Sequence, residues 1–149
     1  QPAAAPAATT VAFAATILDC AGIDLPATVQ GQSLKPLLQG HSPAGWRRAT
    51  YYAYYEDSWR WRDQPAAQMA EPGFQYFTPH RIGPHRGVRS SRYKLIEYFA
   101  EGPDVWEFFD LERDPDELIN RYDDAESQQL MKKMKGELSR LRDQYGDEH

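Results

Sequence analysis

The residues best suited to chemistry form a basic stretch inside an otherwise acidic chain. The whole sequence has 22 Asp and Glu against 17 Lys and Arg, yet residues 72–96 contain no acidic side chain. The basic and imidazole side chains of that window are His80, Arg81, His85, Arg86, Arg89, Arg92 and Lys94. A basic stretch in a chain of negative net charge predicts an anionic ligand or an acidic neighbouring surface. Solvated charges on a hairpin give the same pattern.

Four residues of this stretch are the candidate contacts to such an anion: His85, His80, Arg81 and Arg86. Arginine stays charged and its planar guanidinium donates paired hydrogen bonds to oxyanions, while histidine adds a donor whose strength varies with pH. We expect the first three to lie on a loop before a strand, and a bend at Gly87 to take Arg86 out of the core. Arg89 and Arg92 are expected to be structural ion-pair partners instead.

No complete catalytic or metal-binding group is visible in the sequence. His80 and His85 do not have the spacing of a helical metal pair, and no cysteine or acidic residue accompanies them. No serine lies in a nucleophile elbow and no glycine-rich phosphate loop occurs. Cys20, the one cysteine, is expected to be buried and structural. We therefore predict no catalytic residue and no metal site in this chain.

Composition limits the size and the partners of the protein. A chain of 149 residues, 41% of them hydrophobic, can bury one core. A net charge of -5 argues against general nucleic-acid binding, and no apolar run has the length of a membrane span, so neither partner is expected. Residues 1–9 are expected to be an unstructured lead-in or a truncation point, because they lack the basic start of a signal peptide.

Four predicted strands surround the basic stretch. Aromatic and alternating residues predict them at residues 49–55, 87–89, 92–99 and 105–111, with a hairpin around residues 90–91. Val88 should face the core and Arg89 should point outward. Residues 57–84 have no sustained periodicity and are expected to form a long loop, a length that is uncommon unless the loop is functional or disordered.

Helices are predicted on either side of these strands. The first begins at residue 10, places Val11, Ala14, Ala15 and Leu18 on one face, and stops at Gly22. Helix-start signals occur at residues 114–117 and again at residues 123–126. The last helix has an apolar stripe made of Leu130, Met134, Leu138, Leu141 and Tyr145. The expected fold class is α+β, a small antiparallel β-sheet of about four strands packed by the C-terminal helix and the N-terminal helix.

Three phrases, in this order along the chain, resemble the sulfatase family. They are TILDCAGI with QGQSLKPLL at residues 16–38, HRGVRSSRYKLI at residues 85–96, and WEFFDLERDPDELIN at residues 106–120. The resemblance is to the C-terminal subdomain of formylglycine-dependent sulfatases, such as arylsulfatases and N-sulfoglucosamine sulfohydrolases, and spans residues 10–146. It departs from the family pattern in the first helix, where Ala12 and Ala15 stand in place of Asp and Pro.

The resemblance implies that catalysis and substrate recognition are carried out by different parts of a longer enzyme. In the family, a cysteine or serine in a C-x-P/A-x-R motif becomes a formylglycine, whose hydrate attacks the sulfate beside a bound calcium. Cys20 is not in such a motif, so calcium and formylglycine are expected in a missing N-terminal catalytic domain. This chain is expected to help recognise a sulfated small molecule or glycan, to be inactive alone, and to work in the periplasm or outside the cell.

Two other functions remain open on the residues alone. The first is a noncatalytic module of the same fold that binds an anion, a carbohydrate or a protein, since the aromatic residues at 59–62 and 74–77 suit stacking as well as core packing. The second is an assembly domain that uses the stripe of the last helix. A C-x-P/A-x-R motif upstream in the gene would favour the sulfatase.

Overall fold

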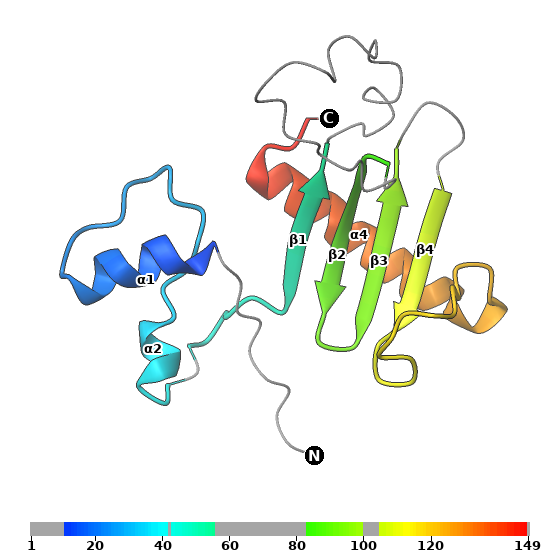
Figure 1. Ribbon diagram of the computed structural model, residues 1–149, viewed down its shortest axis with the longest axis horizontal. Coiled ribbons are helices and arrows are strands. Elements are labelled where there is room, and N and C mark those ends of the chain that lie inside the picture. Colours follow the sequence, from blue (N-terminus) through cyan, green and yellow to red (C-terminus); the bar gives the residue numbers. More distant parts are fainter. Residues whose placement is uncertain (1–10, 42, 56–82, 100–104, 149) are drawn as a thin grey trace, which may run out of the picture.

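A computed structural model describes residues 11–41, 43–55, 83–99 and 105–148. Its centre is a four-stranded antiparallel sheet with strand order β1-β2-β3-β4 (Figure 1). The strands are β1 (Ala49–Tyr54), β2 (His85–Ser90), β3 (Tyr93–Tyr98) and β4 (Val105–Asp110). The helices are α1 (Ala12–Cys20), α2 (Lys35–Leu38), the 3-10 helix η2 (Ala125–Ser127) and α4 (Gln128–Tyr145). The predicted α+β class is confirmed, while residues 1–9 and most of the loop predicted at 57–84 lie outside the described residues.

One face of the sheet is covered by α4, which crosses behind the strands (Figure 1). The register pairs Val88 with Leu95 and Leu95 with Phe108, and these are the largest fully buried side chains of the described part. The helix adds Met131, Met134, Leu138 and Leu141 to the same cluster. Val88 therefore faces the core as predicted, because alternate residues of a strand share one face.

The long helix α4 has the apolar stripe that the sequence predicted, but its N-terminal end differs from the prediction. The predicted stripe packs on the sheet, and Met131, which lay outside that stripe, is buried as well. The helix ends at Gly146, whose φ of 67° is left-handed, and the Asp147 N–H donates to the Arg142 carbonyl at 3.0 Å. The capping box predicted at residues 123–126 is wrong, because η2 precedes α4 and neither has a side-chain cap.

The segment after β4 forms turns and not the helix predicted from residue 114. The Asp114 carboxylate accepts a hydrogen bond from the Ile119 N–H at 2.8 Å and so closes a loop. The Asn120 side chain accepts from the Phe108 N–H at 3.0 Å and donates to the Trp106 carbonyl at 3.1 Å. These polar side chains satisfy backbone groups of the turn and of strand β4, which is why their sequence resembled a helix cap.

The first helix departs most from the expected arrangement. Its buried residues are Ala12 and Ala15, whereas Val11, predicted on the buried side, is exposed. The helix contacts α2, and the two lie beside the β1 edge of the sheet rather than on one of its faces (Figure 1). The predicted packing of the N-terminal helix on the sheet is therefore wrong.

The end of α1 is formed as predicted. Gly22 has a left-handed φ of 71°, and the Ile23 N–H donates to the Leu18 carbonyl at 2.9 Å, which is the pattern of a Schellman motif. Cys20, expected to be buried at this helix end, is exposed instead. The prediction failed because it placed the buried side of α1 on the wrong residues.

Candidate functional site

The candidate site lies on the sheet face turned away from α4, which is termed the second face. Alternation along β2 puts His85, Gly87 and Arg89 on the second face, and Arg86 and Val88 on the α4 side. Neighbouring residues of the basic stretch therefore lie on opposite faces of the sheet, some in the core beneath α4 and some on the second face.

His85 is the first residue of strand β2, and the expectation that it lies on a loop is wrong. The register sets it opposite Tyr54 of β1 and Tyr98 of β3. Its ring stacks on Tyr54 with centroids 5.5 Å apart, meets Tyr98 at 5.4 Å, and meets Tyr52 edge-on at 6.1 Å. These four side chains are termed the His85 cluster.

The hydrogen bond of His85 fixes which ring nitrogen is available. The Nδ1 atom lies 2.9 Å from the Gly83 carbonyl oxygen, which can only accept, so Nδ1 carries a hydrogen. No partner for Nε2 is found among the described residues. That nitrogen accepts a hydrogen bond when the imidazole is neutral and donates one when it is protonated, so it can bind either a hydroxyl or an oxyanion.

The close approach of Tyr52 to strand β2 requires a glycine at position 87. A Cβ on Gly87 would lie 2.4 Å from the Tyr52 hydroxyl and 2.6 Å from the Leu95 carbonyl. The Tyr52 hydroxyl is buried without a hydrogen-bond partner in the described structure, and burial raises its pKa. The Tyr98 hydroxyl donates to Glu107 at 3.2 Å, and burial raises the pKa of Tyr98 to about 12. Both phenols therefore stay protonated at neutral pH.

Charged side chains occur beside the cluster on the second face. Lys94 of β3 pairs with Glu117 from the turn after β4. Arg89 is exposed, and the ion pair expected for it is not found within the described ranges. The second face thus carries one cation, Arg89, and one carboxylate, Glu107 beside Tyr98, for which no ion pair is described, so its charge alone does not select an anionic ligand.

Arg86 lies on the α4 side and is buried, with 7% of its surface exposed. Its guanidinium pairs with the Glu97 carboxylate and lies 4.6 Å above the Phe99 ring centroid. The expected bend at Gly87 that would take Arg86 out of the core is therefore wrong. Its role as a substrate contact stays a prediction, and this burial weighs against it.

Arg92 has the structural role expected for it. Its Nε and Nη2 atoms donate to the two oxygens of Asp110 at 3.0 and 2.9 Å, and its Nη1 lies 2.8 Å from Glu112. The hydrogen bonds from Arg92 hold the pKa of Asp110 below its usual value. The pair joins the β2–β3 hairpin to the end of β4.

Of the four candidate contacts, His85 alone is described on the second face. His80 and Arg81 lie outside the described residues, so their roles stay predictions. The sequence reasoning did not find the tyrosines around His85. The run of tyrosines at residues 51–55 was the available signal, but only the pairing of β1 with β2 shows which of them meet the histidine.

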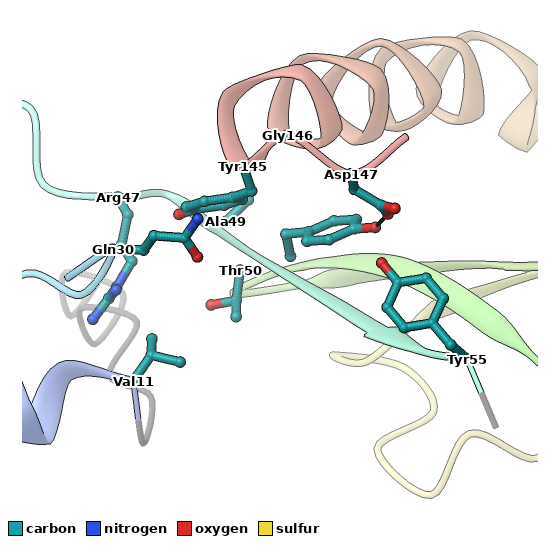
Figure 2. Close-up of a pocket in the computed structure, with 10 residues that line it drawn as sticks. Val11, Gln30, Arg47, Ala49, Thr50, Tyr55, Tyr145, Gly146 and Asp147 are labelled. Atoms are coloured by element: carbon teal, nitrogen blue, oxygen red, sulfur yellow. Dashed lines mark hydrogen bonds between the residues drawn. The ribbon is translucent and has the colours of Figure 1, made fainter. Parts of the chain in front are cut away.

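A cavity of about 290 Å³ lies beside strand β1, between the α1 side and the end of α4 (Figure 2). Tyr51 stacks on Tyr145 with centroids 6.1 Å apart and donates a hydrogen bond to Asp147, and burial raises the pKa of Tyr51. Gln30 and Arg47 line the cavity from the opposite side. The contacts of Tyr51 anchor the residues after α4 to the edge strand β1, and the cavity lies where Val11 and Gln30 of the α1–α2 part approach that edge.

The described residues contain neither a group of metal ligands nor a membrane-spanning helix. No group of three or more His, Cys, Asp or Glu side chains among them is arranged to hold a metal ion. The described part therefore offers no site that fits the calcium of the sulfatase family. No helix in the described ranges has both the length and the apolar character to cross a membrane.

Known proteins are similar in sequence to nearly the whole of this chain. The family model described as N-sulphoglucosamine sulphohydrolase, C-terminal, matches residues 5–68 and 60–144. N-acetylglucosamine-6-O-sulfatase of Bacteroides thetaiotaomicron is 36% identical over 139 residues, which cover 92% of this chain and 21% of that protein. The chain therefore spans only about a fifth of the length of this relative.

Solved structures share the fold over nearly the whole chain. A protein in complex with its substrate D-glucosamine-2-N,6-O-disulfate has a TM-score of 0.73 and 34% identity, covering 92% of this chain and 24% of its own. The phosphonate monoester hydrolase of Agrobacterium radiobacter has a TM-score of 0.63 and 25% identity, covering 88% and 24%. The chain belongs to the sulfatase family, in the region described as N-sulphoglucosamine sulphohydrolase, C-terminal.

Proposed function

We propose that this chain is the substrate-recognition part of a sulfatase, and that the second face of its sheet binds a sulfated sugar beside a catalytic domain. The observation that carries this proposal is the His85 cluster, in which an imidazole nitrogen without a described partner is surrounded by tyrosine rings. Aromatic rings stack on sugars, and the imidazole binds a hydroxyl or, when protonated, a sulfate oxygen.

The bond cleavage is assigned to groups outside this chain. Hydrolysis of a sulfate ester requires a positioned nucleophile, and in this family a metal ion. We propose that formylglycine and calcium belong to the catalytic domain, and that the whole enzyme works in the periplasm or outside the cell. The chain alone should then be inactive, and calcium-dependent turnover of an aryl sulfate by the pure chain would contradict this.

The proposed substrate class is a sulfated amino sugar. One relative is named for N-acetylglucosamine 6-O-sulfate, and another was solved with a glucosamine disulfate as its substrate. The similarity to a phosphonate monoester hydrolase favours one other candidate, a phosphonate monoester, which has the same anionic character. Both classes should be assayed in parallel.

The test uses a chimera in which this chain replaces the matched region of the Bacteroides thetaiotaomicron N-acetylglucosamine-6-O-sulfatase. His85→Ala should lower kcat/KM for N-acetylglucosamine 6-O-sulfate by about tenfold or more, equivalent to about 1.4 kcal/mol. His41→Ala is the matched control, because His41 is exposed and follows α2, away from the His85 cluster. The control should keep its activity.

The kinetics and the melting temperature together distinguish a substrate contact of His85 from a structural role. A selective loss of kcat/KM in His85→Ala, with an unchanged melting temperature, supports a substrate contact. Unchanged kinetics with a lower melting temperature would assign the His85 cluster to the stability of the sheet. Activity on a phosphonate monoester alone would replace the sulfated sugar as the substrate class.

A further inference from the structure

The cavity beside strand β1 is lined by segments that are far apart in the sequence (Figure 2). Strand β1 and its neighbouring residues form one wall, the end of α4 forms another, and residues before and after α1 complete it. Two of the lining residues, Gln30 and Tyr55, are exposed, so solvent reaches the interior. The volume of about 290 Å³ is close to the lower limit of about 300 Å³ for small-molecule pockets, so the cavity suits a ligand of one ring.

One wall of the cavity carries a carboxylate that is almost fully buried. The Asp147 side chain is 4% exposed, accepts a hydrogen bond from the Tyr51 hydroxyl, and lies 4.0 Å from Arg142 Nε. Its backbone is fixed as well, because the Asp147 N–H donates to the Arg142 carbonyl at the end of α4. A carboxylate has about four acceptor sites, so Asp147 can accept from a ligand hydroxyl in addition to Tyr51.

The opposite end of the cavity carries hydrogen-bond donors. Figure 2 shows Arg47 and Gln30 at the end away from Asp147, with Thr50 between them. A guanidinium has five N–H donors, so Arg47 can bind an anionic group and still keep a contact within the protein. The Gln30 amide and the Thr50 hydroxyl each donate and accept. The cavity therefore offers both kinds of hydrogen-bonding group, and one positive charge that can bind an anion.

Aromatic rings line the cavity between these polar groups. Tyr145 of α4 stacks on Tyr51 of β1 with centroids 6.1 Å apart, and Tyr55 adds a third ring. A sugar matches this combination, because its C–H face packs on aromatic rings and each of its hydroxyls both donates and accepts. These rings and the Asp147 carboxylate are held by contacts within the chain, so little ordering is needed when a ligand binds.

We infer that this cavity is a second sugar site, which binds one sugar unit that carries an anionic group. The sugar hydroxyls bond to Asp147 and Gln30, and Arg47 binds the anionic group. The site lies apart from the His85 cluster, because alternation along β1 turns Tyr51 to the opposite side of the strand from Tyr52 and Tyr54. Its role rests on the proposed function: a second unit of the same glycan, held here, raises the effective concentration of the substrate.

Calorimetric titration of the chain with sodium glucuronate, an acidic sugar, tests the site. Glucose is the neutral control, and sodium acetate is the anion without a sugar ring. Glucuronate should bind about tenfold more tightly than glucose, because it adds a charge-assisted hydrogen bond to Arg47. The amide shifts that it causes in NMR spectra should be confined to residues around the cavity, such as Thr50 and Gly146. N-acetylglucosamine 6-O-sulfate is titrated in parallel, and tight binding of either acidic sugar supports the site.

Two variants test the polar contacts separately. Arg47→Gln should reduce the affinity for glucuronate by about tenfold, to that for glucose. Gln30→Ala changes an exposed side chain between α1 and α2, so the fold should persist while both sugars bind more weakly. Arg113→Gln is the matched control and should bind as the wild type does, because Arg113 is 66% exposed and follows β4 at the other edge of the sheet. The chimera is titrated in the same way, so the result does not depend on how the chain behaves alone.

Three results would overturn the inference. Neither acidic sugar could bind to the folded protein with an affinity that depends on Arg47. Acetate could bind as tightly as glucuronate, which would reduce the site to an anion contact of Arg47. The amide shifts could lie on β2 and disappear in His85→Ala, which would place the sugar in the His85 cluster. With the second site correct, His85→Ala should leave glucuronate binding to the chain unchanged, so the second site and the proposed function can fail separately.

Discussion

The two faces of the sheet use neighbouring residues of β2 for opposite purposes. On the α4 side, Arg86 is buried and its charge is matched by Glu97. On the second face, His85 packs among tyrosines and keeps one ring nitrogen without a described partner. A single step along the strand separates a structural ion pair from a candidate binding group, because a strand alternates its faces. The density of basic residues along the sequence therefore does not distinguish the structural ion pair from the candidate binding group.

The largest expected effect comes from breaking the buried pair on the α4 side. Arg86→Ala leaves the Glu97 carboxylate buried without its partner, so it should lower the free energy of unfolding by about 3 to 5 kcal/mol. Urea denaturation of the isolated chain measures this loss. Arg86→Met combined with Glu97→Leu removes both charges and should recover most of the stability. A loss below about 1 kcal/mol in the single variant would mean that water reaches the pair.

A slightly smaller loss is expected from the apolar core on the same side. Leu138 lies in the middle of α4 and is buried in the main cluster, so Leu138→Ala should cost about 2 to 4 kcal/mol. Leu118→Ala is the matched control, since Leu118 is exposed and its truncation should change stability by less than about 0.5 kcal/mol. Equal effects in the two variants would show that α4 does not close the core.

The sequence predicted the sheet and its main helix because both follow short-range periodicity. Alternation along 93–98 and the stripe of α4 are properties of neighbouring residues, and the structure has both. The helix expected at 114 failed since Asp114 and Asn120 bond to the turn and to β4, and these partners are not apparent from periodicity. For α1, the periodicity was correct for a helix but not for its buried side.

The candidate site was only partly predictable for the same reason. The basic stretch identified His85, but its contacts with Tyr52 and Tyr54 depend on the register between β1 and β2. These strands are separated by about thirty residues without periodicity, and no local pattern sets their alignment. The stacking partners of His85 therefore became visible only in three dimensions.

The third prediction concerns Gly87, where Tyr52 of β1 approaches β2 on the second face. Gly87→Ala places a methyl group against Tyr52 and the Leu95 carbonyl, so it should destabilise the chain by about 1 to 3 kcal/mol. Gly136→Ala is the matched change in α4, where an added Cβ meets nothing within 4 Å, and it should stabilise by about 0.5 to 1 kcal/mol. Thermal denaturation measures whether each substitution stabilises or destabilises the chain. A stabilising Gly87→Ala would mean that Tyr52 does not rest on this strand.

The smallest expected effect concerns the pair at the end of the sheet between exposed Arg92 and buried Asp110, in which Arg92 lowers the pKa of Asp110. A carboxyl whose folded pKa is depressed adds stability above its unfolded pKa of about 3.9 and loses it as the pH falls through the folded value. The advantage of the wild type over Asp110→Asn should therefore be present at pH 7 and shrink below about pH 4. Since 40% of the Arg92 side chain is exposed and water screens the pair, the advantage should be about 1 kcal/mol or less. Urea unfolding at both pH values measures it, and a difference that stays constant with pH would assign the role of Asp110 to its hydrogen bonds and not to its charge.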